Sequence, residues 1–157
     1  GGPVFISQIR LGKFGKRIKL WKLRTMKESD TGKWLNDDQN QNKVTRVGYF
    51  LRKSRIDELP QLWNILKGSL SLIGPRPDQE GFVALLEQSI PYYNLRHTVT
   101  PGLSGWAQIN QKKPPQSVEE TRERLAYDLY YVKNHTLFLD LVVLFETIGV
   151  VLMAKGA

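Results

Sequence analysis

The sequence predicts a small α+β domain that is rich in helices, with a β-hairpin near its N-terminus and an apolar helix near its C-terminus. Two segments within residues 4–26 are rich in β-branched and aromatic side chains and flank a glycine-containing turn. Most of the remaining chain repeats apolar side chains at helical spacing. With 157 residues, 41% of them apolar, the chain has the size and core material of one domain, so we treat residues 1–157 as a single unit.

Residues 4–10 and 18–26 predict the two strands of the hairpin. Gly12 and Gly15 lie between them and permit the positive φ angles that such a turn requires. Side chains alternate between the two faces of an extended strand, so Lys22 shares a face with apolar neighbours. We therefore expect a hairpin with a basic loop and a second strand that has cations on one face.

The next segment predicts a loop and two helices. Residues 28–43 are polar and indicate a surface loop. Residues 44–53 and 57–67 carry apolar side chains at helical spacing, so each predicts a helix with one apolar face. Pro60 is tolerated only in the first turn of a helix, so the second helix must begin near Asp57.

Loops and helices alternate over the following sixty residues. Residues 70–77 predict an extended piece that enters a rigid proline loop. Residues 79–95 predict a helix that is broken at Pro91, and residues 100–106 predict a turn fixed by glycine and proline. Residues 117–134 predict a charged amphipathic helix that starts with a capping box.

Residues 137–154 are nearly all apolar and approach the roughly 20 residues of a transmembrane helix. Asp140 and Glu146 lie inside this segment, and each would be costly in the middle of a bilayer. The pattern therefore fits a helix on the membrane surface better than a spanning helix. It fits a buried helix of the core equally well.

The positive charge of the chain is concentrated at one end. The formal net charge is +8; residues 1–55 hold 14 Lys and Arg against 4 Asp and Glu, whereas residues 56–157 hold 9 against 11. This asymmetry is typical of a chain with an anionic partner, such as nucleic acid, anionic lipid or a phosphorylated substrate, and it also fits a solvated basic surface. The absence of cysteine excludes disulfides, cysteine metal sites and a thiol nucleophile.

Asp57 and Glu58 form an adjacent acidic pair. Taken alone, the pair fits a helix cap, because carboxylates in a first turn are stabilised by the helix dipole. Arg52 and Arg55 precede it, and a carboxylate among cations stays ionised where phosphates bind. An aspartate can attack phosphorus to give an acyl phosphate, and the neighbouring glutamate can hold Mg²⁺.

Two further motifs are candidates for substrate binding. Pro75 and Pro77 flank Arg76 and would pre-orient its guanidinium for bidentate phosphate binding. Trp106 ends the Pro-Gly-Leu-Ser-Gly-Trp turn and can stack on a sugar, a base or a helix. The two histidines lack companions at metal-ligand spacing, so no zinc site is expected.

Six motifs follow one another along the chain: GPVFISQIRLGKFGK, WKLRTM, RIDELPQLWNILKG, SLIGPRP, LRHTVTPGLSGWAQIN and YDLYYVKNHTLFLD. In this order, over almost the whole chain, they resemble the bacterial sugar transferase family, the monotopic phosphoglycosyl transferases. Members of that family begin with a hydrophobic re-entrant helix. The resemblance therefore implies a catalytic domain that starts just after such a helix.

The resemblance implies a ping-pong reaction. Asp57 would attack the β-phosphate of a UDP-sugar, release UMP and hold the phosphosugar until undecaprenyl phosphate accepts it. Glu58 would bind Mg²⁺. The reaction would take place at the cytoplasmic face of the bacterial inner membrane, as the first step in the assembly of a surface glycoconjugate.

The resemblance also implies which residues bind the substrates and their phosphates. Lys112 is included because several members carry an arginine shortly after the GWAQ motif. The implied residues are Lys22, Arg52, Arg55, Arg76, Lys112 and Asp140.

Two other functions fit parts of the sequence. A nucleic-acid-binding module would use the basic N-terminal third and its aromatic residues, but no signature of a recognised nucleic-acid-binding fold is present, so we expect no nucleic-acid partner. A non-catalytic scaffold on the membrane surface would use the same basic third and the apolar segment at 137–154. In that alternative, Asp57 and Glu58 only cap a helix.

Overall fold

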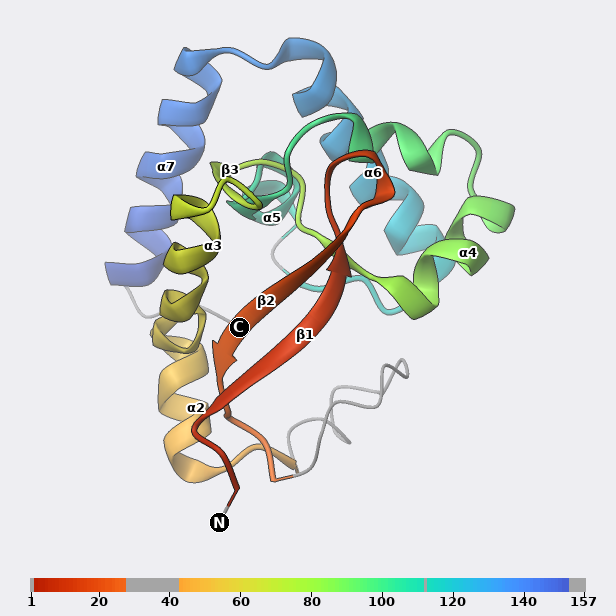
Figure 1. Cartoon of the computed structure of the whole chain (residues 1–157). Helices are drawn as coiled ribbons and strands as arrows, with labels where there is room; N and C mark the ends of the chain where they lie inside the picture. Colours follow the sequence, from red (N-terminus) through yellow and green to blue (C-terminus); the bar gives the residue numbers. More distant parts are fainter. Residues whose placement is uncertain (1, 28–42, 112, 153–157) are drawn as a thin grey trace.

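A long antiparallel hairpin forms one side of the molecule (Figure 1). The structure is a computed structural model that describes residues 2–27, 43–111 and 113–152. Strand β1 (Phe5–Leu11) pairs along its whole length with β2 (Arg17–Leu23). The predicted hairpin is confirmed, whereas most of the predicted loop at 28–43 lies outside the described residues.

Two short elements complete the hairpin sheet: the turn that connects the two strands and a third strand beside β1. The 3-10 turn η1 (Lys13–Gly15) connects the strands, and Gly15 has a φ of 71°, as the glycines of the turn led us to expect. The two-residue strand β4 (Asp78–Gln79) pairs antiparallel with β1 and gives a sheet in the order β2-β1-β4. The proline loop is thereby joined to the hairpin.

A second, parallel pair of strands was predicted only in part. Strand β3 (Ser71–Ile73) is the expected extended piece, and it pairs with β5 (Gly102–Ser104), where the sequence predicted only a turn. Gly102 approaches the backbone of Gly74 so closely that a Cβ atom there would collide with it. The absence of a side chain at Gly102 therefore lets two backbone segments lie close together, rather than permitting a tight turn.

The two helices predicted over 44–67 become three elements that form a continuous curved rod (Figure 1): α2 (Arg46–Lys53), η2 (Ile56–Gln61) and α3 (Leu62–Leu66). Helix α2 is confirmed, with the Thr45 side chain as its N-terminal cap. The second helix begins one residue before Asp57, but its first half is a 3-10 turn. Pro60 lacks an amide hydrogen and therefore cannot support regular α-helical bonding there.

The apolar side chains of these elements face outward rather than into a core. Side chains are exposed along all three elements, with Leu66 79% exposed and Trp63 55% exposed. We call this surface the apolar face. Its members are Val47, Phe50, Leu59, Leu62, Trp63 and Leu66.

The helical half of the molecule encloses the main core. Helix α4 (Glu80–Ser89) ends before Pro91, as predicted, and is followed by the 3-10 segment η3 (Tyr93–Thr98). The core cluster consists of Val83, Leu86, Ile90, Tyr93 and Leu125.

Three further helices complete the fold: α5 (Trp106–Asn110), α6 (Val118–Asn134) and α7 (Leu137–Leu152). The predicted capping of α6 is confirmed, since Ser117 Oγ accepts the Glu120 amide at 3.2 Å. The three strands of the hairpin sheet, the parallel strand pair and the helices together make the predicted α+β class.

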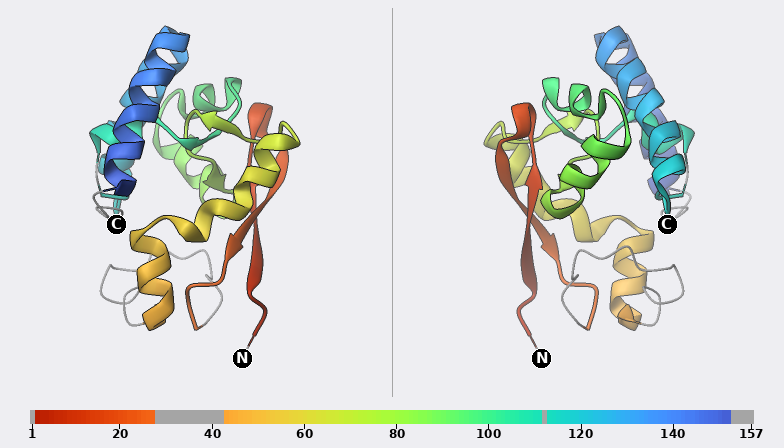
Figure 2. Two further views of the ribbon diagram at one scale, coloured as in Figure 1. Left: turned by 90° about the vertical axis from the view of Figure 1, so that its left-hand side faces the viewer. Right: turned by 90° about the vertical axis from the view of Figure 1, so that its right-hand side faces the viewer.

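The C-terminal helix is buried along only one side. Val143 is fully buried against Ile73 and Tyr131, whereas Leu137, Phe138 and the other outward side chains are exposed. Figure 2 shows α7 standing along one edge of the molecule. Within residues 2–27, 43–111 and 113–152, no helix combines the length and the apolarity needed to cross a membrane.

A buried ionic cluster connects the proline loop to the helices. The Arg96 guanidinium donates to both oxygens of Asp78 at 2.6 Å and lies 2.7 Å from Asp128 Oδ2. Both Arg96 and Asp128 are almost fully buried. Burial would raise the pKa of Asp78, but Arg96 and His97 outweigh it and lower the pKa to about 2. Asp78 is therefore ionised under ordinary conditions, whereas burial raises the pKa of Asp128 in spite of Arg96 and Arg124.

We expect Arg96→Met to lower the free energy of unfolding by about 3–5 kcal/mol, because it leaves the buried Asp128 and the half-buried Asp78 without their cation. The control is Arg17→Met, which removes an exposed ion pair with Glu80 and should cost less than about 1 kcal/mol. Urea unfolding followed by circular dichroism measures both values. If both variants lose the same free energy of unfolding, the buried cluster stabilises the fold no more than an exposed ion pair does.

Candidate active site

The acidic pair lies on a short, tightly wound segment against the hairpin. Asp57 and Glu58 are both buried within η2, and this segment packs on strand β2. Arg55, two residues before Asp57, has a φ of 58°, so the rod bends between α2 and η2. The Asn64 side chain donates to Lys19 O at 2.8 Å and fixes the position of this rod along β2.

Glu58 is the centre of a group of cations. Its Oε1 atom accepts a hydrogen bond from Arg76 Nη2 at 2.6 Å and from Lys22 Nζ at 3.5 Å, and its Oε2 atom lies 3.7 Å from Arg55 Nη1. Burial would raise the pKa of Glu58, but Arg76 and Lys22 together hold it well below its usual range. Three of the predicted phosphate-binding residues, Lys22, Arg55 and Arg76, are thus brought together around an ionised carboxylate.

Asp57 has a different environment from its neighbour. Burial raises the pKa of its carboxyl group, Glu58 adds to the increase, and Lys22, Arg52 and Arg55 oppose it. In the part of the chain that the structure describes, no hydrogen bond engages the carboxylate of Asp57. It lies at the wall of a cavity and is the carboxylate of the pair that can reach a ligand.

The cavity beside Asp57 has a volume of about 500 Å³ and a basic wall. Most of its lining comes from the hairpin and the residues that flank its strands. Arg52 comes from the last turn of α2, where its Nε atom donates to Thr25 Oγ1 at 3.0 Å. This is the size of a small-molecule site, and its charge suits an anion. The cations of its wall are Arg10, Lys22, Arg24, Lys27 and Arg52.

The loop that carries Arg76 is fixed from behind, as the flanking prolines led us to expect. The Gly102 amide donates to Pro75 O at 2.9 Å. The Arg96 guanidinium donates to Arg76 O at 2.9 Å. The buried cluster around Arg96 therefore holds the backbone of the residue whose side chain binds Glu58.

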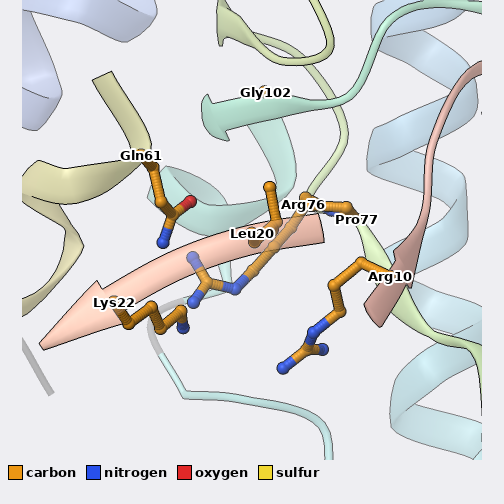
Figure 3. A pocket seen from close by; sticks show the side chains of 7 residues that line it. All are labelled: Arg10, Leu20, Lys22, Gln61, Arg76, Pro77 and Gly102. Atoms are coloured by element: carbon orange, nitrogen blue, oxygen red, sulfur yellow. The ribbon is translucent and has the colours of Figure 1, made fainter. Parts of the chain in front are cut away.

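A second, much smaller pocket lies between η2, β2 and this loop. Its volume is about 10 Å³, and Figure 3 shows the side chains that line it. We call it the oxygen pocket. It is lined by Arg10, Leu20, Lys22, Gln61, Arg76, Pro77 and Gly102.

Two residues of these pockets, Arg10 and Gln61, were missed by the sequence analysis. Arg10 pairs with Ile18, so it shares a face of the hairpin with Lys22, as directly opposed residues do. The alternation that placed Lys22 could have placed Arg10 once the register of the hairpin was known. For Gln61, the signal was its spacing from Glu58, because side chains three residues apart eclipse one another in a 3-10 helix.

One predicted residue, Asp140, does not join this group. Asp140 lies at the corner between α6 and α7, where Tyr131 donates to it at 2.6 Å and His135 lies 3.4 Å away. Its contacts are therefore with those helices and not with Glu58 or Arg76. Lys112 lies outside the described residues.

The acidic pair has the chemistry of a magnesium ligand, although not of a metal cage. Mg²⁺ takes hard oxygen ligands and is commonly held by one or two carboxylates together with substrate phosphates. Asp57 supplies such oxygens at the edge of the basic cavity, and Glu58 is its direct neighbour on η2. Among the described residues, no group of three or more His, Cys, Asp or Glu side chains could hold a metal alone. The pair therefore fits a metal that is shared with a phosphorylated ligand.

Comparison with known proteins agrees with this geometry. A protein of Aeromonas hydrophila named as a UDP-N-acetylgalactosamine-undecaprenyl-phosphate N-acetylgalactosaminephosphotransferase is 43% identical over 99% of this chain, which covers 37% of that protein. A UDP-glucose:undecaprenyl-phosphate glucose-1-phosphate transferase of Escherichia coli (strain K12) is 41% identical over 94% of this chain, which covers 32% of it. The chain thus spans about a third of the length of these two relatives.

A third relative is matched over most of its own length. It is an exopolysaccharide production protein of Rhizobium leguminosarum bv. phaseoli, 39% identical over 94% of this chain and 76% of that protein. A family model described as bacterial sugar transferase matches residues 1–154. The chain therefore belongs to the bacterial sugar transferase family.

Proposed function

We propose that this chain catalyses the transfer of a phosphosugar from a UDP-sugar to undecaprenyl phosphate. The observation that carries the proposal is Asp57, a carboxylate at the wall of a basic cavity beside the ion pair of Glu58 with Arg76. The names of two relatives contain both a UDP-sugar and undecaprenyl phosphate. A third is named for exopolysaccharide production, which supports a role in the assembly of a surface polymer.

In the first step, an Asp57 oxygen attacks the β-phosphorus of the UDP-sugar. The bond from that phosphorus to the oxygen bridging it to the α-phosphate breaks, and UMP leaves with the oxygen and its electron pair. The phosphosugar remains on Asp57 as an acyl phosphate. Asp57 suits this role because it is not engaged by a hydrogen bond within the described residues, whereas Glu58 is engaged by cations through both of its oxygens.

In the second step, a phosphate oxygen of undecaprenyl phosphate attacks the phosphorus held on Asp57. The bond between the phosphorus and the Asp57 oxygen breaks, which restores the carboxylate and gives the lipid-linked diphosphosugar. Neither step needs a base to remove a proton from carbon, so positioning and charge neutralisation carry most of the catalysis. The cations of the cavity wall supply that neutralisation.

The charge state of Lys22 depends on whether a ligand is bound. Burial first, and then Arg76, lower the pKa of its ammonium group to about 8. Both effects disfavour the charged ammonium group in spite of Glu58. A bound diphosphate would favour it. Mg²⁺ held by Glu58 would add further neutralisation of the charge on the two phosphates.

We propose that the apolar face and the outer side of α7 rest on the cytoplasmic face of the bacterial inner membrane. The acceptor is a lipid, and the exposed aromatic and aliphatic side chains of these elements would lie among the acyl chains. Lys67 lies over the Trp63 ring, 5.0 Å from its centroid, where its ammonium group can reach anionic headgroups. Figures 1 and 2 show α2, α3 and α7 on the same side of the molecule.

The test of the reaction is release of UMP from a panel of UDP-sugars with Mg²⁺ and undecaprenyl phosphate in detergent. We expect Asp57→Asn to lower the rate by at least about 10³-fold, because the amide is no nucleophile. Intact mass spectrometry should detect a phosphosugar adduct on the unchanged chain alone. Glu87→Gln, an exposed position on α4, is the control. Full activity of Asp57→Asn would eliminate this mechanism and leave the pair as a helix cap.

A second test concerns the metal. Removal of divalent cations with a chelator should stop UMP release, and added Mg²⁺ should restore it. We expect Glu58→Gln to raise the Mg²⁺ concentration for half-maximal activity at least about 10-fold, since a carboxylate ligand is lost. Activity that persists in chelator would contradict a role for Mg²⁺. An unchanged Mg²⁺ requirement in Glu58→Gln would show that Glu58 does not bind the metal.

A third test concerns the membrane. Trp63→Glu should weaken co-sedimentation with vesicles containing phosphatidylglycerol about 10-fold or more, because it removes a large apolar side chain and adds a repelled charge. Leu85→Glu makes the same kind of change at an exposed position on α4 and should have little effect. If both variants bind equally well, the apolar face is not the membrane contact.

A further inference from the structure

Gln61 is a buried polar residue that the reaction described above does not use. Its side chain is only 3% exposed, and it lies at the end of η2, three residues after Glu58. Because a 3-10 helix has three residues per turn, the side chains of Glu58 and Gln61 lie above one another on the same face. Gln61 is therefore directed toward the cations that Glu58 gathers.

The amide nitrogen of Gln61 is buried and has no hydrogen-bond partner among the described residues. Such groups are rare in folded proteins, because an unpaired buried donor destabilises the fold. In Figure 3, the nitrogen of the amide is turned toward the Arg76 guanidinium and the Lys22 ammonium. These three groups line the oxygen pocket together, and all of them are hydrogen-bond donors.

The size of the oxygen pocket limits what it can take. Its volume of about 10 Å³ is close to the least that can hold one water molecule. A sugar, a base or a whole phosphate is too large, whereas a single oxygen atom attached to a larger group outside fits. Convergent donors around a space of one oxygen atom match a non-bridging oxygen of a phosphate.

We propose that the oxygen pocket receives one non-bridging oxygen of the donor's diphosphate, and that Gln61 donates its amide hydrogen to that oxygen beside Lys22 and Arg76. This inference rests on the proposed function. Gln61 would differ from the cations in its role, since a neutral amide fixes the direction of the phosphate without adding charge. It is then a binding residue of the reaction, four residues after the nucleophile.

Two substitutions distinguish this role from a structural one. Gln61→Met keeps the size of the side chain and removes the donor. Gln61→Glu keeps the shape but leaves an acceptor that carries charge. If Gln61 only accepted a hydrogen bond from Arg76, Gln61→Glu would preserve that bond. If Gln61 donates to a phosphate oxygen, the same substitution replaces the donor with a carboxylate that repels the phosphate.

The first experiment measures the thermal stabilisation of the full chain by pyrophosphate, which needs neither turnover nor lipid. We expect pyrophosphate to raise the Tm of the unchanged chain, to raise that of Gln61→Met much less, and to leave that of Gln61→Glu unchanged. Gln88→Glu, the same charge change at an exposed position on α4, should behave as the unchanged chain. Equal stabilisation of all four proteins would overturn the proposal.

The second experiment measures kcat/KM for UMP release. We expect a loss of about 10²-fold in Gln61→Met and a larger loss in Gln61→Glu, each with a Tm in the absence of ligand close to that of the unchanged chain. Turnover that is normal in both variants would sink this inference and leave the proposed function standing. Pyrophosphate binding that depends on Gln61, with no turnover by the unchanged chain, would support the binding role of Gln61 and overturn the proposed function. No binding and no turnover by the unchanged chain would overturn both.

Discussion

The ion pair between Glu58 and Arg76 is the interaction on which the site depends. It joins η2 to the loop after β3, and Lys22 adds strand β2 to the same carboxylate. Because the carboxylate is buried and its partners come from different segments, separating these segments would leave buried charge without compensation, which favours one arrangement of the three. Asp57 precedes Glu58 and is therefore positioned at the cavity wall by the pair that its neighbour forms.

A second layer of buried charge supports the first. Arg96 holds the backbone of Arg76 and both oxygens of Asp78, and it pairs with Asp128 on α6. The proline loop is thus fixed on one side by helices and on the other by Glu58. Burying these polar groups close to the cavity costs free energy of folding. In return, the Arg76 guanidinium is held in place before a ligand arrives, which lowers the entropy lost on binding.

The distribution of apolar side chains also separates two parts of the molecule. The buried clusters lie between α4, η3 and α6 and around α7, whereas the rod of α2, η2 and α3 exposes its apolar residues. A soluble protein rarely leaves a contiguous surface of this kind uncovered. The same rod carries the acidic pair on its inner side, so a lipid surface against its outer side would lie within one helix diameter of Asp57.

The sequence by itself determined several of the elements and singled out the acidic pair as the candidate site. The hairpin, the break at Pro91 and the capping of α6 follow from local patterns of side chains, which act over a few residues. Only the tertiary structure decided that Gly102 serves a strand pair, that the apolar face points outward and that Gln61 and Arg10 line a pocket with Arg76. Those outcomes depend on contacts between segments far apart in the chain, and periodicity tells which residues share a face but not what that face meets.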